Sequence, residues 1–424
     1  MIKIRLLTLY LLLVVTVCTA AATECYAVMD GDTLRMGNSR IERVCLWNNG
    51  HLITCRVTDK RSGKTWIMAG KVADFSVNRA APSGGEIRVE EMPGDGIRPS
   101  RLVTTVNYKL GSLEVERSYR LYDGVAAIAV DTRLRGSLSG VTDKEISDAD
   151  RSNIEHAEDM NVKPVTAVID RVMLSGQHWH GRAVEFRDIT DWNNNLVDER
   201  NFISYRKTNH RGNVLIITDG ADGGGFVFLK EAPCSGVQLA YKNADFISDF
   251  GTFMVTGLGV DNKDVSPDKW TRTYGSVLCT FGDGELSALS ALRNYQKQCR
   301  VLDPARDEMV MMNTWGDRSQ DAKVNEAFCL AELDKAARLG ITLFQIDDGW
   351  QAGKSPNSAS AGGSFKDIYA NASYWTPDPL KYPSGLTPIV DRGRELGIEI
   401  GLWFNPSVQN DFADWQKDAA TIIG

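Results

Sequence analysis

The stretch LFQIDDGW, residues 343–350, decides how this sequence is interpreted. Its first four residues form a short, largely apolar run, which predicts a buried strand. Two carboxylates, Asp347 and Asp348, follow the run directly, and Trp350 stands two residues further on. Ionised carboxylates side by side repel each other and gain nothing there unless hydrogen-bond donors reach them. The stretch therefore predicts a strand that ends at a ligand-binding edge.

Strands and helices alternate on both sides of this stretch. Apolar runs at 310–312 and 398–403 predict one strand before and one strand after the strand at 341–346. Because strands joined through single helices run parallel, the order strand, helix, strand, helix, strand indicates repeated βα units. This order is typical of a (β/α)8 (TIM) barrel, whose active site lies at the C-terminal ends of its strands.

Two helices are predicted between these strands. The first runs from an N-cap at Asp321 to about Arg338 and is stopped by Gly340. The second lies between 386 and 396 and stops at Gly397. Each glycine is followed at once by a new apolar strand, so the connections are as short as those of a barrel.

Each predicted strand ends in polar and aromatic residues, namely 313–317, 347–350 and 403–406. Carboxylates accept hydrogen bonds from sugar hydroxyls, and tryptophan faces cover the apolar C–H surface of a pyranose. An isolated Asp-Asp-Gly is more often a plain turn, and tryptophans at strand ends are often core. Repetition on three strands favours a sugar-binding edge over both. With five histidines in the chain and none near the carboxylates, a zinc site is disfavoured, whereas a Mg²⁺ site on the two aspartates stays open.

The part of the chain before this segment, from about residue 24 to 276, reads as many short strands separated by turn residues. Apolar and polar residues largely alternate over 112–121, and two apolar runs at 214–218 and 225–229 flank a glycine-rich turn, which predicts a hairpin. So many strands in one block indicate a large β-sandwich. Leu286, Leu289, Leu292 and Tyr295 then recur at helical spacing and predict a linker helix.

The first residues resemble a secretory signal peptide. Lys3 and Arg5 precede an apolar run over 6–17 and small residues at 19–22. A lipoprotein signal ending at Cys18 is the weaker alternative, because Val17 is not small. The apolar run is too short to cross a bilayer, which takes about 20 residues. A secreted or periplasmic location is therefore expected.

Composition narrows the class of partner. The formal charge of −7 is modest for 424 residues, and acidic and basic residues are interspersed, so neither nucleic acid nor a membrane surface is an expected partner. The eight cysteines become seven without Cys18 and cannot all pair within the chain. Cys45 and Cys55 flank a turn and are candidates for one bridge, but buried thiols are the favoured state.

Four motifs in order resemble glycoside hydrolase family 36, the α-galactosidase family. They are Asn313-Thr314-Trp315-Gly316, the stretch 344–350, Trp375 ahead of Lys381-Tyr382-Pro383-Ser384-Gly385-Leu386, and Gly401-Leu402-Trp403. The resemblance implies that Asp347 and Asp348 bind O4 and O6 of a terminal α-galactose and that Trp315 and Trp403 wall the same subsite. The chain has Asn405 and Tyr374 where the family often has acidic residues. A different or modified terminal sugar is therefore an open alternative.

The resemblance also implies a retaining glycosidase whose nucleophile and acid/base are aspartates on later strands, roughly 5 Å apart. Both are expected beyond Gly424, the third helix being predicted at 411–423, and none of the residues present is assigned a catalytic role. We expect a signal peptide over 1–22, a β-sandwich over 23–283, a linker helix over 284–307 and a truncated barrel of three βα units over 308–424.

The expected partner is an oligosaccharide or polysaccharide with a terminal α-galactose-like sugar, with no cofactor and no metal, and the family also suggests a homo-oligomer. Two other functions stay open. One is a non-catalytic carbohydrate-binding protein, and the other is a galactosyl transferase of the raffinose-synthase type.

Overall fold

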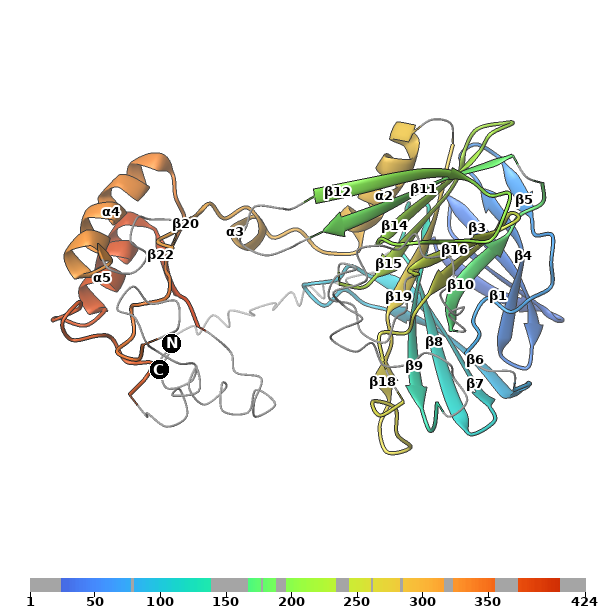
Figure 1. Ribbon diagram of the computed structural model, residues 1–424, viewed down its shortest axis with the longest axis horizontal. Coiled ribbons are helices and arrows are strands. Elements are labelled where there is room, and N and C mark those ends of the chain that lie inside the picture. Colours follow the sequence, from blue (N-terminus) through green and yellow to red (C-terminus); the bar gives the residue numbers. More distant parts are fainter. Residues whose placement is uncertain are drawn as a thin grey trace, which may run out of the picture. The chain divides into compact units, whose positions relative to one another are not determined.

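The computed structural model describes residues 24–77, 80–138, 167–176, 178–187, 196–233, 244–260, 262–282, 285–315, 323–354 and 373–404. The chain forms two compact units, Met1–Val301 and Leu302–Gly424. The first unit contains antiparallel sheets, and the second contains a parallel sheet with helices (Figure 1).

Three antiparallel sheets make up the first unit. The five-stranded sheet follows chain order and consists of β1 (Tyr26–Asp30), β2 (Thr33–Gly37), β3 (Ile41–Asn48), β4 (His51–Asp59) and β5 (Thr65–Ile67). The four-stranded sheet has the spatial order β10 (Val168–Met173), β17 (Thr252–Thr256), β16 (Phe246–Asp249) and β13 (Thr208–His210). The ten-stranded sheet has the order β12 (Leu196–Ile203), β11 (Trp179–Arg187), β14 (Val214–Asp219), β15 (Gly225–Glu231), β19 (Gly275–Phe281), β9 (Ala127–Arg135), β8 (Leu113–Leu121), β7 (Arg101–Leu110) and β6 (Pro82–Met92), with β18 (Thr271–Arg272) paired to β9.

The core of the first unit lies between the large sheet and the two smaller ones. Its main apolar cluster joins Leu34 of β2, Val115 of β8 and Phe253 of β17, one residue from each sheet. Strand β8 alternates strictly between buried and half-buried residues, as the alternation over 112–121 predicts for a strand with one face in the core. The predicted β-rich region and the β14–β15 hairpin are therefore confirmed.

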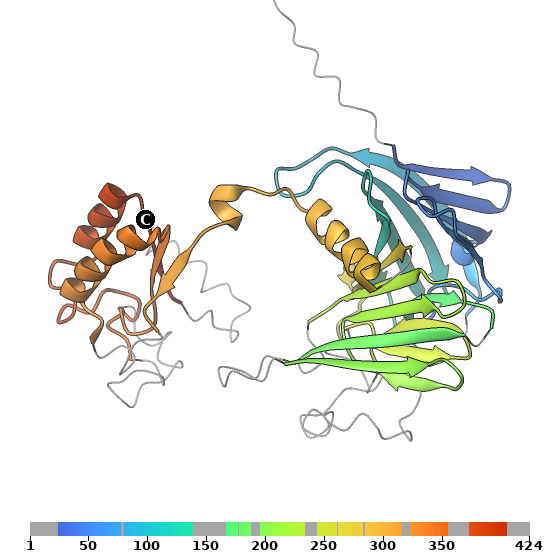
Figure 2. The same cartoon turned by 90° about the horizontal axis from the view of Figure 1, so that it is seen from above.

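Helix α2 (Glu285–Gln298) covers the other face of the large sheet (Figure 2). Ala288 and Tyr295 are buried against Val277 and Cys279 of β19. The helix predicted at this place is confirmed, and two of the four residues that predicted it, Leu292 and Tyr295, pack on the sheet. Leu286 is 78% exposed and Leu289 is 44% exposed, because the helix turns its small alanine toward the sheet.

A bridge between Cys45 and Cys55 is not formed, since both thiols are free. Strand β3 pairs Cys45 with Thr54 rather than with Cys55, and the register shifts between Val44 and Cys45. The Cys45 side chain is buried in the core, whereas the Cys55 thiol donates to the Val44 carbonyl at 3.2 Å. Burial raises the pKa of the Cys45 thiol to about 12, so it stays protonated and unreactive.

A buried charge cluster joins β3 and β10, which belong to the two smaller sheets. Arg43 donates to both carboxylate oxygens of Asp170, at 3.0 and 2.7 Å, and also to Asp74 at 3.0 Å and to Thr54 at 2.7 Å. Arg43 and Asp170 are fully buried. Burial alone would raise the pKa of Asp170, but the Arg43 guanidinium outweighs it and lowers that pKa below its usual value.

The second unit begins with the short helix α3 (Pro304–Asp307) and contains the parallel sheet β20 (Met311–Asn313), β21 (Leu343–Ile346) and β22 (Glu399–Leu402), in that order. Helices α4 (Glu326–Leu339) and α5 (Thr387–Leu396) connect these strands. Gly340 and Gly397 end the helices in the left-handed conformation, with φ of 74° and 69°, as predicted. The parallel βα order is confirmed, and closure into a barrel stays a prediction.

The first of these helices starts later than predicted. Its N-cap is Asn325, whose side chain accepts a hydrogen bond from the backbone of Phe328 at 2.9 Å, and the helix begins at Glu326. Asp321, the predicted cap, lies outside the described residues, as do Asn405, Asp317 and the third helix at 411–423. None of the helices in the described ranges is long and apolar enough to span a membrane.

Candidate functional site

The C-terminal ends of β20, β21 and β22 bring the predicted site residues together. Asn313 lies opposite Gln345, and Ile346 lies opposite Leu402, so the residues that follow all three strands emerge at one edge of the sheet. Asp347 and Asp348 follow β21, and Trp403 follows β22. The backbone of Trp403 donates to the Ile346 carbonyl at 2.9 Å, which continues the pairing up to this edge.

Asp347 is held by the neighbouring strand. Its Oδ2 accepts a hydrogen bond from Nδ2 of Asn313 at 2.6 Å, and its backbone N–H donates to Oγ1 of Thr314 at 3.0 Å. Its Oδ1 accepts from the backbone N–H of Asp348 at 2.7 Å. The side chain is half-buried. Asn313 therefore supplies one of the donors that adjacent carboxylates need, and it fixes the direction of the Asp347 carboxylate.

Asp348 is more deeply enclosed and is 3% exposed. Its Oδ1 accepts from Nε2 of Gln351 at 2.7 Å, and Oε1 of Gln351 accepts from the backbone of Gly349 at 3.0 Å. Gly349 has φ of 99°, a conformation that favours glycine. The backbone of Asp-Asp-Gly therefore does form a turn, as the alternative to a sugar-binding edge predicted. This turn also fixes the position of the Asp348 carboxylate.

Aromatic side chains pack beside this turn. Trp350 is fully buried, and its indole N–H donates to the Trp403 carbonyl at 2.9 Å. Trp375 stacks on Trp350, with ring centroids 6.1 Å apart and an interplanar angle of 27°, and lies 6.2 Å from the Trp403 ring. Phe404 also contacts Trp350 and Trp375 at 5.5 and 5.1 Å. Trp403 is therefore anchored in an aromatic cluster and is half-buried.

Trp315 is connected to the strand-end site through Asn313. Its backbone N–H donates to Oδ1 of Asn313 at 2.7 Å, and its side chain is half-buried. Among the described residues, the ring contacts of the aromatic cluster include Trp403 but not Trp315. The structure thus brings Asp347, Asp348 and Trp403 to one edge and ties Trp315 to it through Asn313.

Three contributors were not assigned a role from the sequence: Asn313, Gln351 and Lys381. Nζ of Lys381 donates to the Gly349 carbonyl at 2.8 Å and so braces the turn from the loop before α5. Asn313 and Lys381 lie inside the motifs quoted from the sequence, and this position was the only sign in the sequence that they contribute to the site. Their roles depend on contacts 34 and 32 residues away along the chain, which no local pattern reveals.

Groups for other chemistries are scarce at this edge. Cys329 of α4 is buried, and burial raises the pKa of its thiol to about 12, so it is not an activated nucleophile. Within the described ranges, no three His, Cys, Asp or Glu side chains gather as a metal site would require. What the geometry provides is two oriented carboxylates beside tryptophan faces, an arrangement suited to hydroxyl-rich ligands.

In this chain a parallel β/α sheet with such an edge follows a large antiparallel β-rich unit, and comparisons with known proteins find the same order. Residues 273–420 match the Melibiase family. The chain is 25% identical over 318 residues to α-galactosidase Mel36A of Lactobacillus acidophilus, covering 72% of this chain and 39% of the relative. It is 24% identical over 339 residues to α-galactosidase AgaA of Geobacillus stearothermophilus, covering 76% and 42%.

The fold agrees with these matches. The solved structure of the glycoside hydrolase family 36 α-galactosidase AgaB from Geobacillus stearothermophilus aligns with a TM-score of 0.57 at 14% identity, covering 90% of this chain and 57% of that one. The chain therefore spans well under two thirds of the length of these relatives. Its sequence is thus similar to family 36 α-galactosidases, and residues 273–420 resemble the Melibiase family.

Proposed function

We propose that this chain belongs to an exported retaining glycoside hydrolase that removes terminal α-galactose from oligosaccharides. The family match supports glycoside hydrolysis of α-galactosides, and the signal-like residues 1–22 support export. Two variants of the similar enzyme AgaA are solved with raffinose and with stachyose. Oligosaccharides of this kind are the substrates that we propose here.

One observation carries the proposal, namely the enclosed Asp348 carboxylate at the end of β21. A buried carboxylate must be satisfied by donors, and Gln351 supplies one of them at 2.7 Å. In the proposed subsite, hydroxyls O4 and O6 of galactose donate to Asp347 and Asp348. Trp403 and Trp315 would then cover the apolar face of the ring.

Neither aspartate is proposed as nucleophile or acid/base. A retaining glycosidase places its two carboxyl groups roughly 5 Å apart on opposite sides of the scissile bond. Asp347 and Asp348 are neighbours on one strand end, joined by a hydrogen bond from the backbone of one to the side chain of the other. The resemblance to family 36 assigns the catalytic aspartates to strands after β22, and we propose the same for this protein.

Sugar binding by the 424-residue chain tests the subsite. Titration with galactose should change the tryptophan fluorescence, because Trp375 and Trp403 belong to the cluster beside the two carboxylates. Glucose, which differs only in the orientation of O4, should bind at least about tenfold more weakly, since one charge-assisted hydrogen bond is lost. Equal affinity for the two sugars, or no response to galactose, would contradict the proposed subsite.

A further inference from the structure

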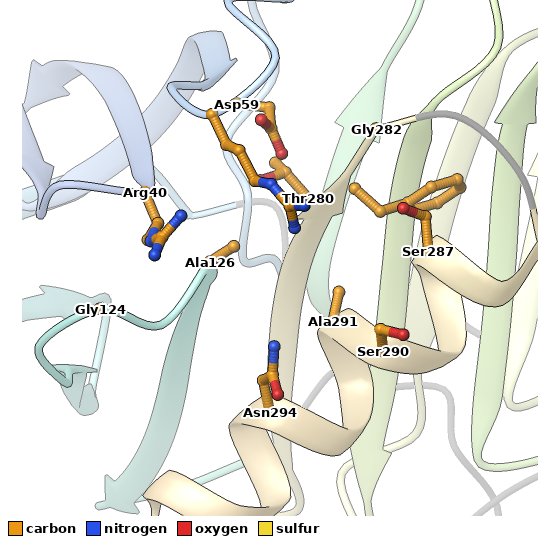
Figure 3. A pocket seen from close by; sticks show the side chains of 12 residues that line it. Arg40, Asp59, Gly124, Ala126, Thr280, Gly282, Ser287, Ser290, Ala291 and Asn294 are labelled. Atoms are coloured by element: carbon orange, nitrogen blue, oxygen red, sulfur yellow. The ribbon is translucent and has the colours of Figure 1, made fainter.

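The first unit contains a pocket that the proposed active site does not use. It lies where the ends of β4 and β19 meet helix α2, and its volume is about 350 Å³. That volume is at the lower end of the range of about 300 to 1,000 Å³ that is usual for small-molecule sites. Figure 3 shows α2 on one side of the pocket and the β3–β4 region on the other. The residues that line it are Arg40, Asp59, Arg61, Gly124, Ala126, Thr280, Phe281, Gly282, Ser287, Ser290, Ala291 and Asn294.

Two arginines line the strand side. The backbone of Arg40 is fixed by hydrogen bonds from its N–H to Oδ1 of Asn38 at 2.7 Å and from the Lys60 N–H to its carbonyl at 2.8 Å. Arg61 lies in the tight turn after β4, in which the Gly63 N–H donates to the Asp59 carbonyl at 2.8 Å. Neither guanidinium forms an ion pair with a residue in the described ranges. Two positive charges therefore face the pocket.

The pocket also contains polar groups that can form hydrogen bonds with the hydroxyls of a ligand. Asp59 is 3% exposed, and its Oδ1 accepts from the backbone and the hydroxyl of Ser62 at 2.8 and 3.0 Å. Thr280 is 1% exposed, and its hydroxyl has no hydrogen-bond partner among the described residues.

Helix α2 completes the lining with small and polar side chains. Ser287, Ser290 and Asn294 are spaced by three and four residues, so they lie on one face of the helix. Figure 3 shows this face directed at the pocket, with Ala291 between the polar residues. The alanine leaves room, while the two hydroxyls and the amide supply both donors and acceptors.

These groups call for a ligand with two chemistries. Guanidinium groups recognise carboxylate and phosphate oxygens, frequently through two parallel hydrogen bonds. An inorganic anion would use the arginines, but sulfate has no hydroxyl to donate to Asp59 and hydrogen phosphate has only one. A neutral sugar could bond Asp59, Asn294 and the serines, but it would form no ionic contact with the two exposed guanidinium groups.

We propose that this pocket binds a hexuronate, that is, a pyranose ring that carries a carboxylate. The carboxylate accepts from Arg40 and Arg61. The ring hydroxyls donate to Asp59 and Ser290 and accept from Asn294. The site is separate from the strand-end subsite and takes a different sugar, so the proposal does not depend on α-galactosidase activity.

Calorimetric titration of the 424-residue chain with galacturonate tests the proposal, with galactose and inorganic phosphate as comparison ligands. Galacturonate should bind, and Arg40→Gln and Arg61→Gln should each weaken it about tenfold or more, because each removes a charge-assisted contact. Ser290→Trp should abolish binding by filling the pocket. Arg88→Gln, on an exposed arginine of β6 that pairs with Glu90, is the matched control and should change nothing.

The variants also distinguish this site from the proposed galactose subsite. Asp348→Asn should leave galacturonate binding unchanged, and Ser290→Trp should leave galactose binding unchanged. Galacturonate binding that Asp348→Asn removes but Ser290→Trp does not would place the sugar at the strand ends and overturn the proposal. Phosphate binding as tightly as galacturonate would reduce the pocket to a simple anion site. Absence of galacturonate binding would equally refute it.

Discussion

Replacing Asp348 by asparagine is the sharpest test of the strand-end subsite. The two side chains have nearly the same shape, and the asparagine oxygen can still accept from Nε2 of Gln351, which lies 2.7 Å from the native carboxylate. The variant therefore keeps the turn and removes the charge. Asp348→Ala would also leave the Gln351 amide without this acceptor, which costs about 1 to 3 kcal/mol of stability.

The expected loss of affinity follows from the hydrogen bonds that Asp348 would accept. Bonds to charged groups contribute about 1.5 to 3 kcal/mol, against about 0.5 to 1.5 kcal/mol for neutral ones. In the proposed subsite we assign one galactose hydroxyl to this carboxylate. Losing the charge then costs about 1 to 1.5 kcal/mol, so Asp348→Asn should weaken galactose binding roughly tenfold.

Fluorescence titration with galactose measures this loss, and urea unfolding shows whether stability has changed. Asp391→Asn is the control, because Asp391 of α5 is 55% exposed and pairs only with its helix neighbour Arg394 at 2.7 Å among the interactions described for it. The control should bind galactose as the unmodified chain does. If Asp348→Asn also binds like the unmodified chain, Asp348 has a structural role only, and the subsite must be abandoned.

Three further predictions concern stability and activity. His210 stacks on Phe202, and burial lowers the pKa of its imidazole to about 4, against about 6.5 in the unfolded chain. Because the unfolded chain takes up the proton first as the pH falls, the free energy of unfolding should decrease between pH 6.5 and pH 4 by up to about 3 kcal/mol. Urea titrations at several pH values should show that His210→Phe reduces this loss. Arg43→Met should lower the free energy of unfolding at pH 7 by about 3 to 5 kcal/mol, because Asp170 is left buried without its cation. Arg133→Met, which removes the exposed partner of Glu116, is the control and should change it by less than about 1 kcal/mol. The purified 424-residue chain should not hydrolyse an aryl α-galactoside. The reason is that Asp347 and Asp348 cannot act as a pair in which one attacks the anomeric carbon and the other protonates the leaving group. Measurable release of the phenol would contradict this assignment.

Local signals in the sequence predicted the second unit well. Each helix stop is a glycine that reaches the left-handed conformation more easily than other residues, so Gly340 and Gly397 could be recognised without the structure. The apolar runs gave the three parallel strands to within two residues. The first strand, predicted at 310–312, is observed at Met311–Asn313. Motif order then placed Asp347 and Asp348 at a strand end.

Competing local signals and long-range contacts account for what could not be predicted. Asp321 and Asn325 are both good N-cap residues, and only the position of the helix relative to its core selects Asn325. On α2, the sheet accepts Leu292 and Tyr295 of the predicted stripe together with Ala288, but Leu286 and Leu289 stay exposed. Packing against a flat sheet favours a small residue at the closest approach, and this preference depends on the partner rather than on the helix.

One long-range contact and one contact within the turn explain why the Asp347–Asp348 turn and a sugar subsite are compatible. A flexible carboxylate loses rotational freedom when a ligand binds, at a cost of about 0.5 to 1.5 kcal/mol for each side chain that becomes fixed. Asn313 holds Asp347 from the neighbouring strand, and Gln351 holds Asp348 from within the turn, so both carboxylates are oriented before any ligand arrives. These donors are uncharged amides, which orient the carboxylates without neutralising them. A turn that fixes its own carboxylates is therefore better suited to bind sugar hydroxyls than an exposed pair would be.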